Sequence, residues 1–381
     1  MISKNNVTSL LLVCCTIALI SMICCAGCIT TPALSQNGIH IAAQNDRTGN
    51  MLASFSERYQ ESTQVPVLVS QFDTWDQVEF QEYDLIDLII VDVATLQSLA
   101  EQSKITPITI LSDGSMNKTT FDSIMLQPYT IESNLYGLPL HPDMLGFVIW
   151  ADLFESEDEI HAFSEAYGYH IGNPLTYHDL LDIIAFISRP ETQRYGIGIA
   201  GDEPDALQNL YESIMHSYGR TPTDEDVQEA EAVFQKLILH TPSEYTTWTR
   251  ENVTNALLQR NIQSAITWFS EFETLSSPEH NPDNDKFIFL PLPGSWNSQE
   301  SFHSVSIPRG WVFAVPNTPG ENADVSAFLK WFYQPDTQWE WMQAGMQPMI
   351  HEIQESWEYI MANGYNAAYI ISLRNAWRNT A

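Results

Sequence analysis

Residues 85–93 read LIDLIIVDV, an apolar run that is rich in β-branched side chains. Such a run is expected for a strand that is buried on both faces of a sheet. Two further strands and two helices are predicted around it: strands at 39–43 and 65–70, and helices at 50–61 and 95–102. In the first helix Met51, Phe55 and Tyr59 recur every four residues and share one face. The order strand, helix, strand, strand, helix predicts an α/β fold with a mostly parallel sheet, in which ligands gather beyond the carboxyl ends of the strands.

The remainder of the chain continues the mixture of strands and helices, with Thr176 as a predicted helix cap. Strands are predicted at 147–150, 195–201, 264–267, 287–292 and 311–315, and helices at 179–188, 204–217, 225–239, 252–260, 321–333, 336–344, 350–362 and 365–378. Five tryptophans fall on or near the late helices and are expected to pack in the core: Trp331, Trp339, Trp341, Trp357 and Trp377. The length of 381 residues suggests about two domains.

The charge balance excludes several classes of partner. The chain carries 48 acidic and 16 basic residues, a formal net charge of −32. A nucleic-acid-binding protein needs a basic face to neutralise phosphates, so no nucleic-acid partner is expected. Attraction of the body to anionic lipid by charge is excluded for the same reason. With 44% hydrophobic and 11% aromatic residues, the chain has enough apolar surface to bury a large core.

The N-terminal 28 residues differ from the rest. They contain Lys4 as their only charge and a long apolar stretch. All the cysteines of the chain lie there: Cys14, Cys15, Cys24, Cys25 and Cys28. This excludes a disulfide framework and a cysteine-based zinc site in the body. We interpret residues 1–28 as an export signal or membrane anchor and residues 29–38 as a tether. The alternative to a cleaved signal is an uncleaved transmembrane helix, because the apolar run is long enough to span a bilayer. Either way the body is expected outside the cytoplasm.

Two parts of the chain resemble known protein families. Cys25-Ala26-Gly27-Cys28 resembles the lipobox of prokaryotic lipoproteins, which implies lipidation of Cys28. Seven stretches of the body, in this order, are similar to landmarks of the extracellular solute-binding proteins that feed ABC importers, most of all the sugar- and maltodextrin-binding branch: YGLPLHPDMLGFVIWADLF (136–154), NPLTYHDL (173–180), YGIGIAG (195–201), QRNIQSAITW (259–268), FLPLPG (289–294), RGWVFAVPN (309–317) and FLKWFYQPDTQWEWMQAGMQP (328–348).

The second resemblance implies a two-lobed, periplasmic-binding-protein-like (type II) α/β fold, with a hinge and a ligand cleft between the lobes. It places residues 39–138 and 265–305 in the first lobe, and residues 142–262 and 314–381 in the second. The chain would then cross between lobes near 138–142, 262–268 and 305–314. It also implies a receptor that binds a small solute, most of all an oligosaccharide or another neutral polyol, and delivers it to the permease of an ABC transporter.

Ligand-binding candidates follow from position and residue type. A sugar site combines flat aromatic faces with a few polar groups that fix hydroxyls. The aromatic candidates are Trp75, Trp268, Phe272 and Trp311, each of which could instead be a packing residue. The polar candidates are Asn45, Asp46, Asp92, His141, Asp143 and Arg309. For Asn45, Asp46 and Asp92 the alternative is an Asx turn or a helix cap. For His141 and Asp143 the alternative is solvation of the hinge.

No enzyme motif marks the chain. It contains no G-x-S-x-G, no H-E-x-x-H and no P-loop sequence, and its ten histidines are scattered. We therefore expect no catalytic residue, cofactor or metal. Two rival functions stay open: an exported carbohydrate-active enzyme, which needs two carboxylates about 5–10 Å apart, and a receptor that presents its ligand to a membrane sensor. Without residues 1–27 the chain keeps 15 bases against 48 acids, and this balance favours a neutral or cationic ligand over an anionic one.

Overall fold

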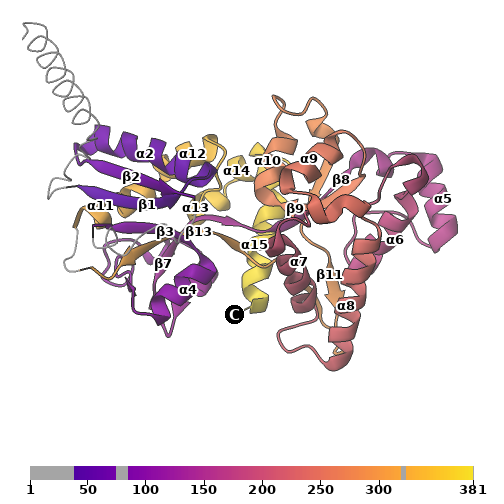
Figure 1. Cartoon of the computed structure of the whole chain (residues 1–381), viewed down its shortest axis with the longest axis horizontal. Coiled ribbons are helices and arrows are strands. Elements are labelled where there is room, and N and C mark those ends of the chain that lie inside the picture. Colours follow the sequence, from indigo (N-terminus) through magenta and orange to yellow (C-terminus); the bar gives the residue numbers. More distant parts are fainter. Residues whose placement is uncertain (1–37, 74–84, 319–322, 381) are drawn as a thin grey trace, which may run out of the picture. The chain divides into compact units, whose positions relative to one another are not determined.

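The computed structural model describes residues 38–73, 85–318 and 323–380 (Figure 1). Residues 39–381 form one compact unit. The predicted anchor at 1–28 and Trp75 lie outside the described residues, as does most of the predicted tether. Within the described residues, none of the helices combines the length and the apolar character that crossing a membrane requires.

The first lobe is built on a six-stranded sheet with the order β2-β1-β3-β13-β4, in which β7 also pairs with β13. The central strands β1 to β3 are parallel, as the sequence predicts, and β13 runs antiparallel to both β3 and β7. Residues 88–91 of β3 are all buried, which agrees with the apolar run that begins at Leu85. The strands of this sheet are β1 (Ile39–Gln44), β2 (Val67–Phe72), β3 (Leu88–Asp92), β4 (Ile105–Thr106), β7 (Gly137–Asp143) and β13 (Arg309–Pro316).

Helices cover both faces of the first sheet (Figure 1). One face packs against α2 (Arg47–Thr63), α11 (Ala323–Phe332) and α12 (Pro335–Gln343), and the other against α4 (Val93–Glu101). Alternate residues of β3 serve the two faces, because successive side chains of a strand point to opposite sides. Leu88 and Ile90 join the larger core beneath α2, while Ile89 and Val91 join a separate core beneath α4.

The second lobe is built on a three-stranded antiparallel sheet of order β10-β8-β9. Its strands are β8 (Leu145–Trp150), β9 (Ser264–Trp268) and β10 (Phe287–Leu290), with a hairpin of β11 (Gly294–Trp296) and β12 (Phe302–Ser304) beside them. Its helices are α5 (Glu157–Tyr167), α6 (Tyr177–Ile187), α7 (Pro204–Ser217), α8 (Asp224–Leu239), α9 (Arg250–Leu258) and α10 (Phe269–Ser276). Thr176 caps α6 with a capping box, as predicted. A small hairpin of β5 (Thr130–Ile131) and β6 (Asn134–Leu135) precedes β7.

The chain passes between the lobes twice at one place. It leaves the first sheet at the end of β7, enters the second at β8, and returns at the start of β13, beside β7. Gly310 makes this close approach possible. Its φ of +99° is left-handed, and a Cβ there would collide with the backbone of His141 and Asp143. The paired residues 137–143 and 309–314 include parts of the two segments, near 138–142 and 305–314, where crossings between lobes are expected.

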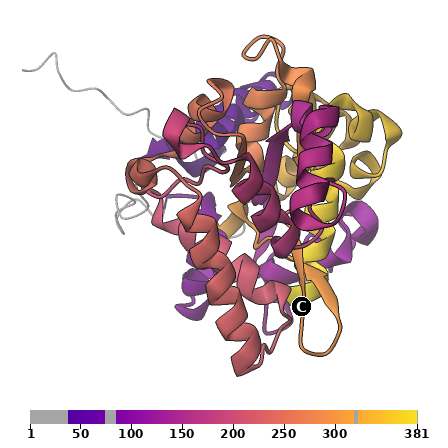
Figure 2. The same cartoon turned by 90° about the vertical axis from the view of Figure 1, so that its right-hand side faces the viewer.

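Three helices end the chain, and the last of them contacts the hinge. They are α13 (His351–Gln354), α14 (Trp357–Ala362) and α15 (Asn366–Thr380). Tyr369 of α15 donates its hydroxyl to the Pro142 carbonyl at 3.0 Å, and its ring meets Phe269 of the second lobe edge to face. In the two views of Figures 1 and 2 this helix, in yellow, runs beside the second lobe. α15 therefore contacts both the end of β7, where the chain leaves the first lobe, and the second lobe.

Strand pairing corrects the predicted lobe boundaries. Residues 265–305 were expected in the first lobe, but β9 and β10 both pair with β8 in the second. The crossing expected near 262–268 is therefore wrong. Residues 314–343 were expected in the second lobe, but α11 and α12 pack on α2, where Trp341 contacts Phe55. Order and spacing along a chain do not reveal which sheet a strand joins, because antiparallel pairing partners can be far apart in sequence.

Three local predictions also need correction. The segment 195–201 forms only isolated bridges: Tyr195 with Ile262, just before β9, and Gly198 with Ala265 of β9. The helix expected over 350–362 is divided between α13 and α14, because Ser356 caps the second helix instead of continuing the first. Trp357 was expected in the core, but it begins α14 with 70% of its surface exposed. Of the other late tryptophans, Trp341 is fully buried and Trp331 and Trp339 are half-buried.

Candidate functional site

The first turn of α2 lies at the carboxyl end of β1. Asp46 caps this helix, and its Oδ1 accepts a hydrogen bond from the Gly49 amide at 2.8 Å. Asn45 is exposed and donates to Asp73 at 3.0 Å. Burial raises the pKa of Asp46, against hydrogen bonds from Gly49, Thr48 and the Trp311 side chain and against the charge of Arg250. The cap interpretation of Asp46 is confirmed, and the same carboxylate also faces groups from other elements.

Trp311 and Asp92 lie opposite each other on neighbouring strands, at the same end of the first sheet. Asp92 caps α4 and accepts hydrogen bonds from the amide and hydroxyl of Thr95 at 2.8 and 2.9 Å. Trp311 is half-buried and lines a hollow of about 30 Å³ together with Gln44, Phe72 and Asp92. This end of the sheet therefore presents an aromatic face among polar groups.

On the second lobe, Trp268 ends β9 and is 95% buried beneath Arg250, whose guanidinium lies 5.5 Å from the centre of the indole ring. Arg250 begins α9 and forms a bidentate pair with Glu203, with Nη2–Oε2 at 2.8 Å and Nε–Oε1 at 3.1 Å. Burial alone would raise the pKa of Glu203, but Arg250 lowers it below the ordinary value. The Glu203 carboxylate thus fixes the planar guanidinium over the ring.

Further carboxylates act on Arg250 from nearby. The charges of Asp143 and Glu271 both raise its pKa. Asp143 accepts hydrogen bonds from the hydroxyl and amide of Ser270, at 2.7 and 3.2 Å, and from the Met144 amide at 2.9 Å. Glu271 accepts a hydrogen bond from Thr254 at 2.8 Å. Burial raises the pKa of both carboxyls, so the cluster disfavours additional negative charge.

His141 lies on β7, just before the chain leaves the first lobe. It is 92% buried, and its Nδ1 lies 3.2 Å from the Thr48 hydroxyl of α2. Burial and the nearby charge of Arg47 lower its pKa to about 4, so the ring is neutral near pH 7. The alternative that His141 is a solvated hinge residue is wrong, because the ring is enclosed between β7 and α2.

The remaining predicted residues fall in different places. Arg309 begins β13 and pairs with Glu212 of α7, Nη2–Oε2 3.2 Å, so it joins the first sheet to the second lobe. Phe272 was predicted to face ligand, but it is fully buried among Phe269, Phe289 and Tyr365 and belongs to the core. Trp75 and Cys28 lie outside the described residues.

Sequence reasoning missed Arg250 and Glu203, which are central to the second-lobe half of the site. One signal was available. Because the chain has only 16 basic residues against 48 acidic ones, any arginine of the body is a candidate partner for a carboxylate. Glu203 had no signal, because it precedes Pro204 at a helix start, where an acidic residue is common. Arg250, which the sequence did not single out, thus lies over Trp268, and its charge acts on the carboxyls of Asp46 and Asp143.

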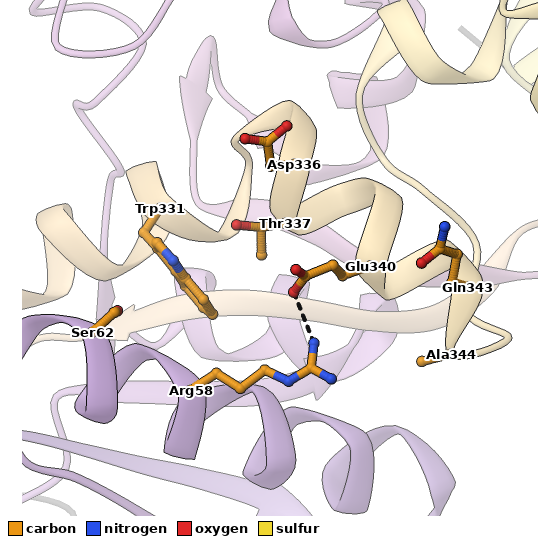
Figure 3. Close-up of a pocket in the computed structure, with 8 residues that line it drawn as sticks. All are labelled: Arg58, Ser62, Trp331, Asp336, Thr337, Glu340, Gln343 and Ala344. Carbon is orange, nitrogen blue, oxygen red and sulfur yellow. Dashed lines mark hydrogen bonds and ion pairs between the residues drawn. The ribbon is translucent and has the colours of Figure 1, made fainter.

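Hollows at the site are small. One of about 10 Å³ is lined by His141, Asp143 and Ser270, and the hollow beside Trp311 holds about 30 Å³. A sugar-sized ligand needs several hundred Å³, so neither hollow can hold one without movement of the lobes. A larger groove of about 660 Å³ lies elsewhere, between α2 and α12 (Figure 3). Its exposed Arg58–Glu340 pair, at 2.8 Å, and Trp331 line an open surface that includes none of the predicted site residues. Among the described residues, no cluster of His, Cys, Asp or Glu could hold a metal.

Comparison with known proteins gives a family and a fold. The family model described as bacterial extracellular solute-binding protein matches residues 54–367. No curated protein sequence matches the chain. Solved structures are similar over most of their length, including the maltose-bound MalE3 of T. maritima, with 18% identity, a TM-score of 0.70, and coverage of 89% of this chain and 88% of that one.

A second similar structure is an ABC transporter solute-binding protein from Agrobacterium radiobacter K84 in complex with ribitol. It has 14% identity and a TM-score of 0.69, and the match covers 91% of this chain and 90% of that one. A third is such a protein from Agrobacterium vitis S4 with bound D-mannitol, with 12% identity, a TM-score of 0.65, and coverage of 89% and 84%. At these identities the likeness establishes the two-lobed α/β fold.

Proposed function

This chain belongs to the bacterial extracellular solute-binding proteins, and from that premise we propose that it binds a small neutral polyol or oligosaccharide between its lobes. The protein would then deliver the bound ligand to the permease of an ABC transporter. The observation that carries the proposal is the pairing of aromatic and polar groups on the two sides: Trp311 with Asp46 on the first lobe, and Trp268 with Arg250 on the second. Relatives of the same fold are described with ribitol, mannitol or maltose.

The charges favour a neutral ligand over an anionic one. Arg250 is a cation of this site, and it is already paired with Glu203 and influenced by the charges of Asp143 and Glu271. A carboxylate or phosphate on the ligand would face these groups and Asp46. Hydroxyl groups, by contrast, can donate to carboxylate oxygens and accept from the guanidinium. A polyol therefore satisfies the polar groups without adding negative charge.

The ligand class can be tested with the full chain purified in detergent. Mass spectrometry of small molecules released on denaturation identifies retained cargo. Melting temperature is then measured with ribitol, mannitol, maltose and a maltodextrin, against citrate as an anionic control. We expect at least one polyol or sugar to raise the melting temperature, by mass action on the folded state, and citrate to have no effect. Stabilisation by citrate alone would contradict the proposal.

Attachment to the membrane is the second part of the proposal. Lipidation of Cys28 would tether the body to the outer face of the cell membrane. The support is the Cys25-Ala26-Gly27-Cys28 sequence after an apolar stretch. Metabolic labelling with a fatty-acid analogue should mark the wild type and not Cys28→Ser, with Cys24→Ser as the matched control. Equal labelling of Cys28→Ser would contradict lipidation at this position.

A further inference from the structure

Two adjacent residues of opposite charge begin α2: the N-cap Asp46 and the first helical residue, Arg47. Arg47 reaches the second lobe. Arg47 Nη2 lies 2.5 Å from Glu273 Oε2 on α10. The ion pair between Arg47 and Glu273 therefore joins the first lobe to the second. Burial raises the pKa of the neighbouring Asp46, and the charge of Arg250 on α9 of the second lobe opposes that rise. The charges that the two lobes bring to this boundary are thus of opposite sign.

The Arg47–Glu273 pair is built into its surroundings. Arg47 also donates to the Gly345 carbonyl at 3.3 Å. Gly345 has a φ of +86°, and a Cβ there would collide with the Glu273 carboxylate and crowd the Arg47 guanidinium. Burial raises the pKa of Glu273 even though Arg47 is beside it. A carboxylate that has lost this much solvation is stabilised in its charged form by a close partner.

The Arg250 side is also fixed. The bidentate contact with Glu203 and the indole of Trp268 hold the guanidinium in one orientation. The chain has 48 acidic but only 16 basic residues. There is thus one base for every three carboxylates, and an ion pair at the lobe boundary uses one of these few bases. We propose that Asp46 and Arg47, with Arg250 and Glu273, form a seam of complementary charge that positions the two lobes on each other and sets how readily the cleft closes.

The seam deepens the proposed function, and it rests on that function only for the idea that a ligand drives closure. Its effect on lobe position can be measured without any ligand. The lobes of the full chain in detergent would carry a donor and an acceptor dye at two exposed positions, Glu61 on α2 and Ala166 on α5. The dyes would be attached through non-natural amino acids, because the native cysteines rule out specific thiol labelling. Single-molecule energy transfer then reports the distribution of lobe separations.

Arg47→Glu places an acidic side chain opposite Glu273, so the ion pair is replaced by repulsion between like charges. An acidic residue in the first turn favours the helix dipole, so α2 itself is not weakened. We expect the ratio of open to closed molecules to rise about two- to fivefold, the range expected for a half-exposed ion pair. Glu273→Arg should act in the same direction. The exchange Arg47→Glu with Glu273→Arg should restore the wild-type distribution.

The same helix offers a matched control. Arg58 pairs with Glu340 at 2.8 Å, but both residues belong to the first lobe (Figure 3). Arg58→Glu, alone or with Glu340→Arg, should leave the distribution of lobe separations unchanged. Asp46→Asn keeps the helix cap while removing the charge, and it should open the lobes in wild-type protein but not in an Arg250→Gln background.

The seam would be overturned by an unchanged distribution in Arg47→Glu, by failure of the exchanged pair to restore it, or by an equal response in Arg58→Glu. These outcomes are distinct from a failure of the ligand proposal. If no sugar or polyol raises the melting temperature while Arg47→Glu opens the lobes, the ligand class is wrong and the seam holds. If polyols bind while Arg47→Glu has no effect, binding holds and the seam is wrong.

Discussion

The first lobe contains two aromatic regions of opposite character. On the face of the sheet that α2 covers, the Trp341 ring meets the Phe55 and Phe332 rings edge to face, with ring centres 5.0 and 5.1 Å apart. All three side chains are fully or nearly fully buried. At the carboxyl end of the same sheet, half-buried Trp311 faces Asp92 and Asp46. The rings of the first region pack mainly on one another, with the Arg58 guanidinium 4.8 Å from the centre of the Phe55 ring. Trp311, by contrast, lies among carboxylates. From this difference we predict that substitutions in the first region lower stability and that substitutions in the second weaken ligand binding.

Removing Trp341 should have the largest effect. Trp341→Ala leaves a cavity between Phe55 and Phe332, and truncation of a buried aromatic costs ~3–5 kcal/mol. The indole N–H has no hydrogen-bond partner among the described residues, so the loss is one of packing. We expect a large fall in the free energy of unfolding, measured by denaturant titration. Trp357→Ala, at an exposed helix start, is the matched control and should change it by less than about 0.5 kcal/mol. Equal effects would contradict the distinction between buried and exposed late tryptophans.

His141 should make stability depend on pH. Its pKa is about 4 in the folded state against 6.5 ordinarily, so the unfolded chain binds the proton more readily between these values. Stability should therefore be complete above about pH 6.5 and fall as the pH drops toward 4, by up to roughly 3 kcal/mol. Asp46, Asp143, Glu271 and Glu273 act oppositely, because burial raises their pKa values and their folded forms take up protons more readily.

The histidine contribution can be separated from these carboxyls by comparing variants. The quantity to compare is the fall in unfolding free energy between pH 6.5 and pH 4, not the absolute stability of each variant. This fall should be smaller in His141→Gln than in the wild type. His178→Gln, which removes an exposed histidine paired with Glu229 at 3.2 Å, should keep the wild-type slope. A wild-type slope in His141→Gln would show that the buried ring does not govern the acid response.

The sequence predicted the first lobe better than the second. The apolar run from Leu85 and the helix periodicity of Phe55 and Tyr59 are local signals, and both are confirmed. The assignment of residues 265–305 failed because the pairing of β9 and β10 with β8 depends on contacts far apart in sequence. The resemblance supplied the landmarks in order, but order alone does not assign a strand to a sheet.

The site was predicted in part for the same reason. Asp46 and Asp92 lie at the carboxyl ends of the parallel strands β1 and β3, and the rule for such sheets locates them there without knowledge of side chains. Trp311 lies near the start of the antiparallel strand β13, opposite Asp92, and that rule does not locate it. Phe272 and Trp268 stand four residues apart and look equally suitable in sequence. The structure separates them, because Phe272 points into an aromatic core while Trp268 lies under Arg250. Arg250 itself arrives from α9, whose position is set by packing in the second lobe.

Trp311 tests the binding half of the comparison, with a smaller expected effect than Trp341 has on stability. Trp311→Ala should weaken the binding of the retained ligand by ~1–3 kcal/mol, as truncation of an aromatic contact does, measured by calorimetry with the ligand identified by mass spectrometry. The free energy of unfolding should fall less than in Trp341→Ala, because Trp311 is half-buried. Trp311→Phe keeps a flat ring and should retain most of the affinity. If Trp311→Ala binds as tightly as the wild type, the residue belongs with Trp341 among the packing aromatics, and the ligand contact on the first lobe must come from elsewhere.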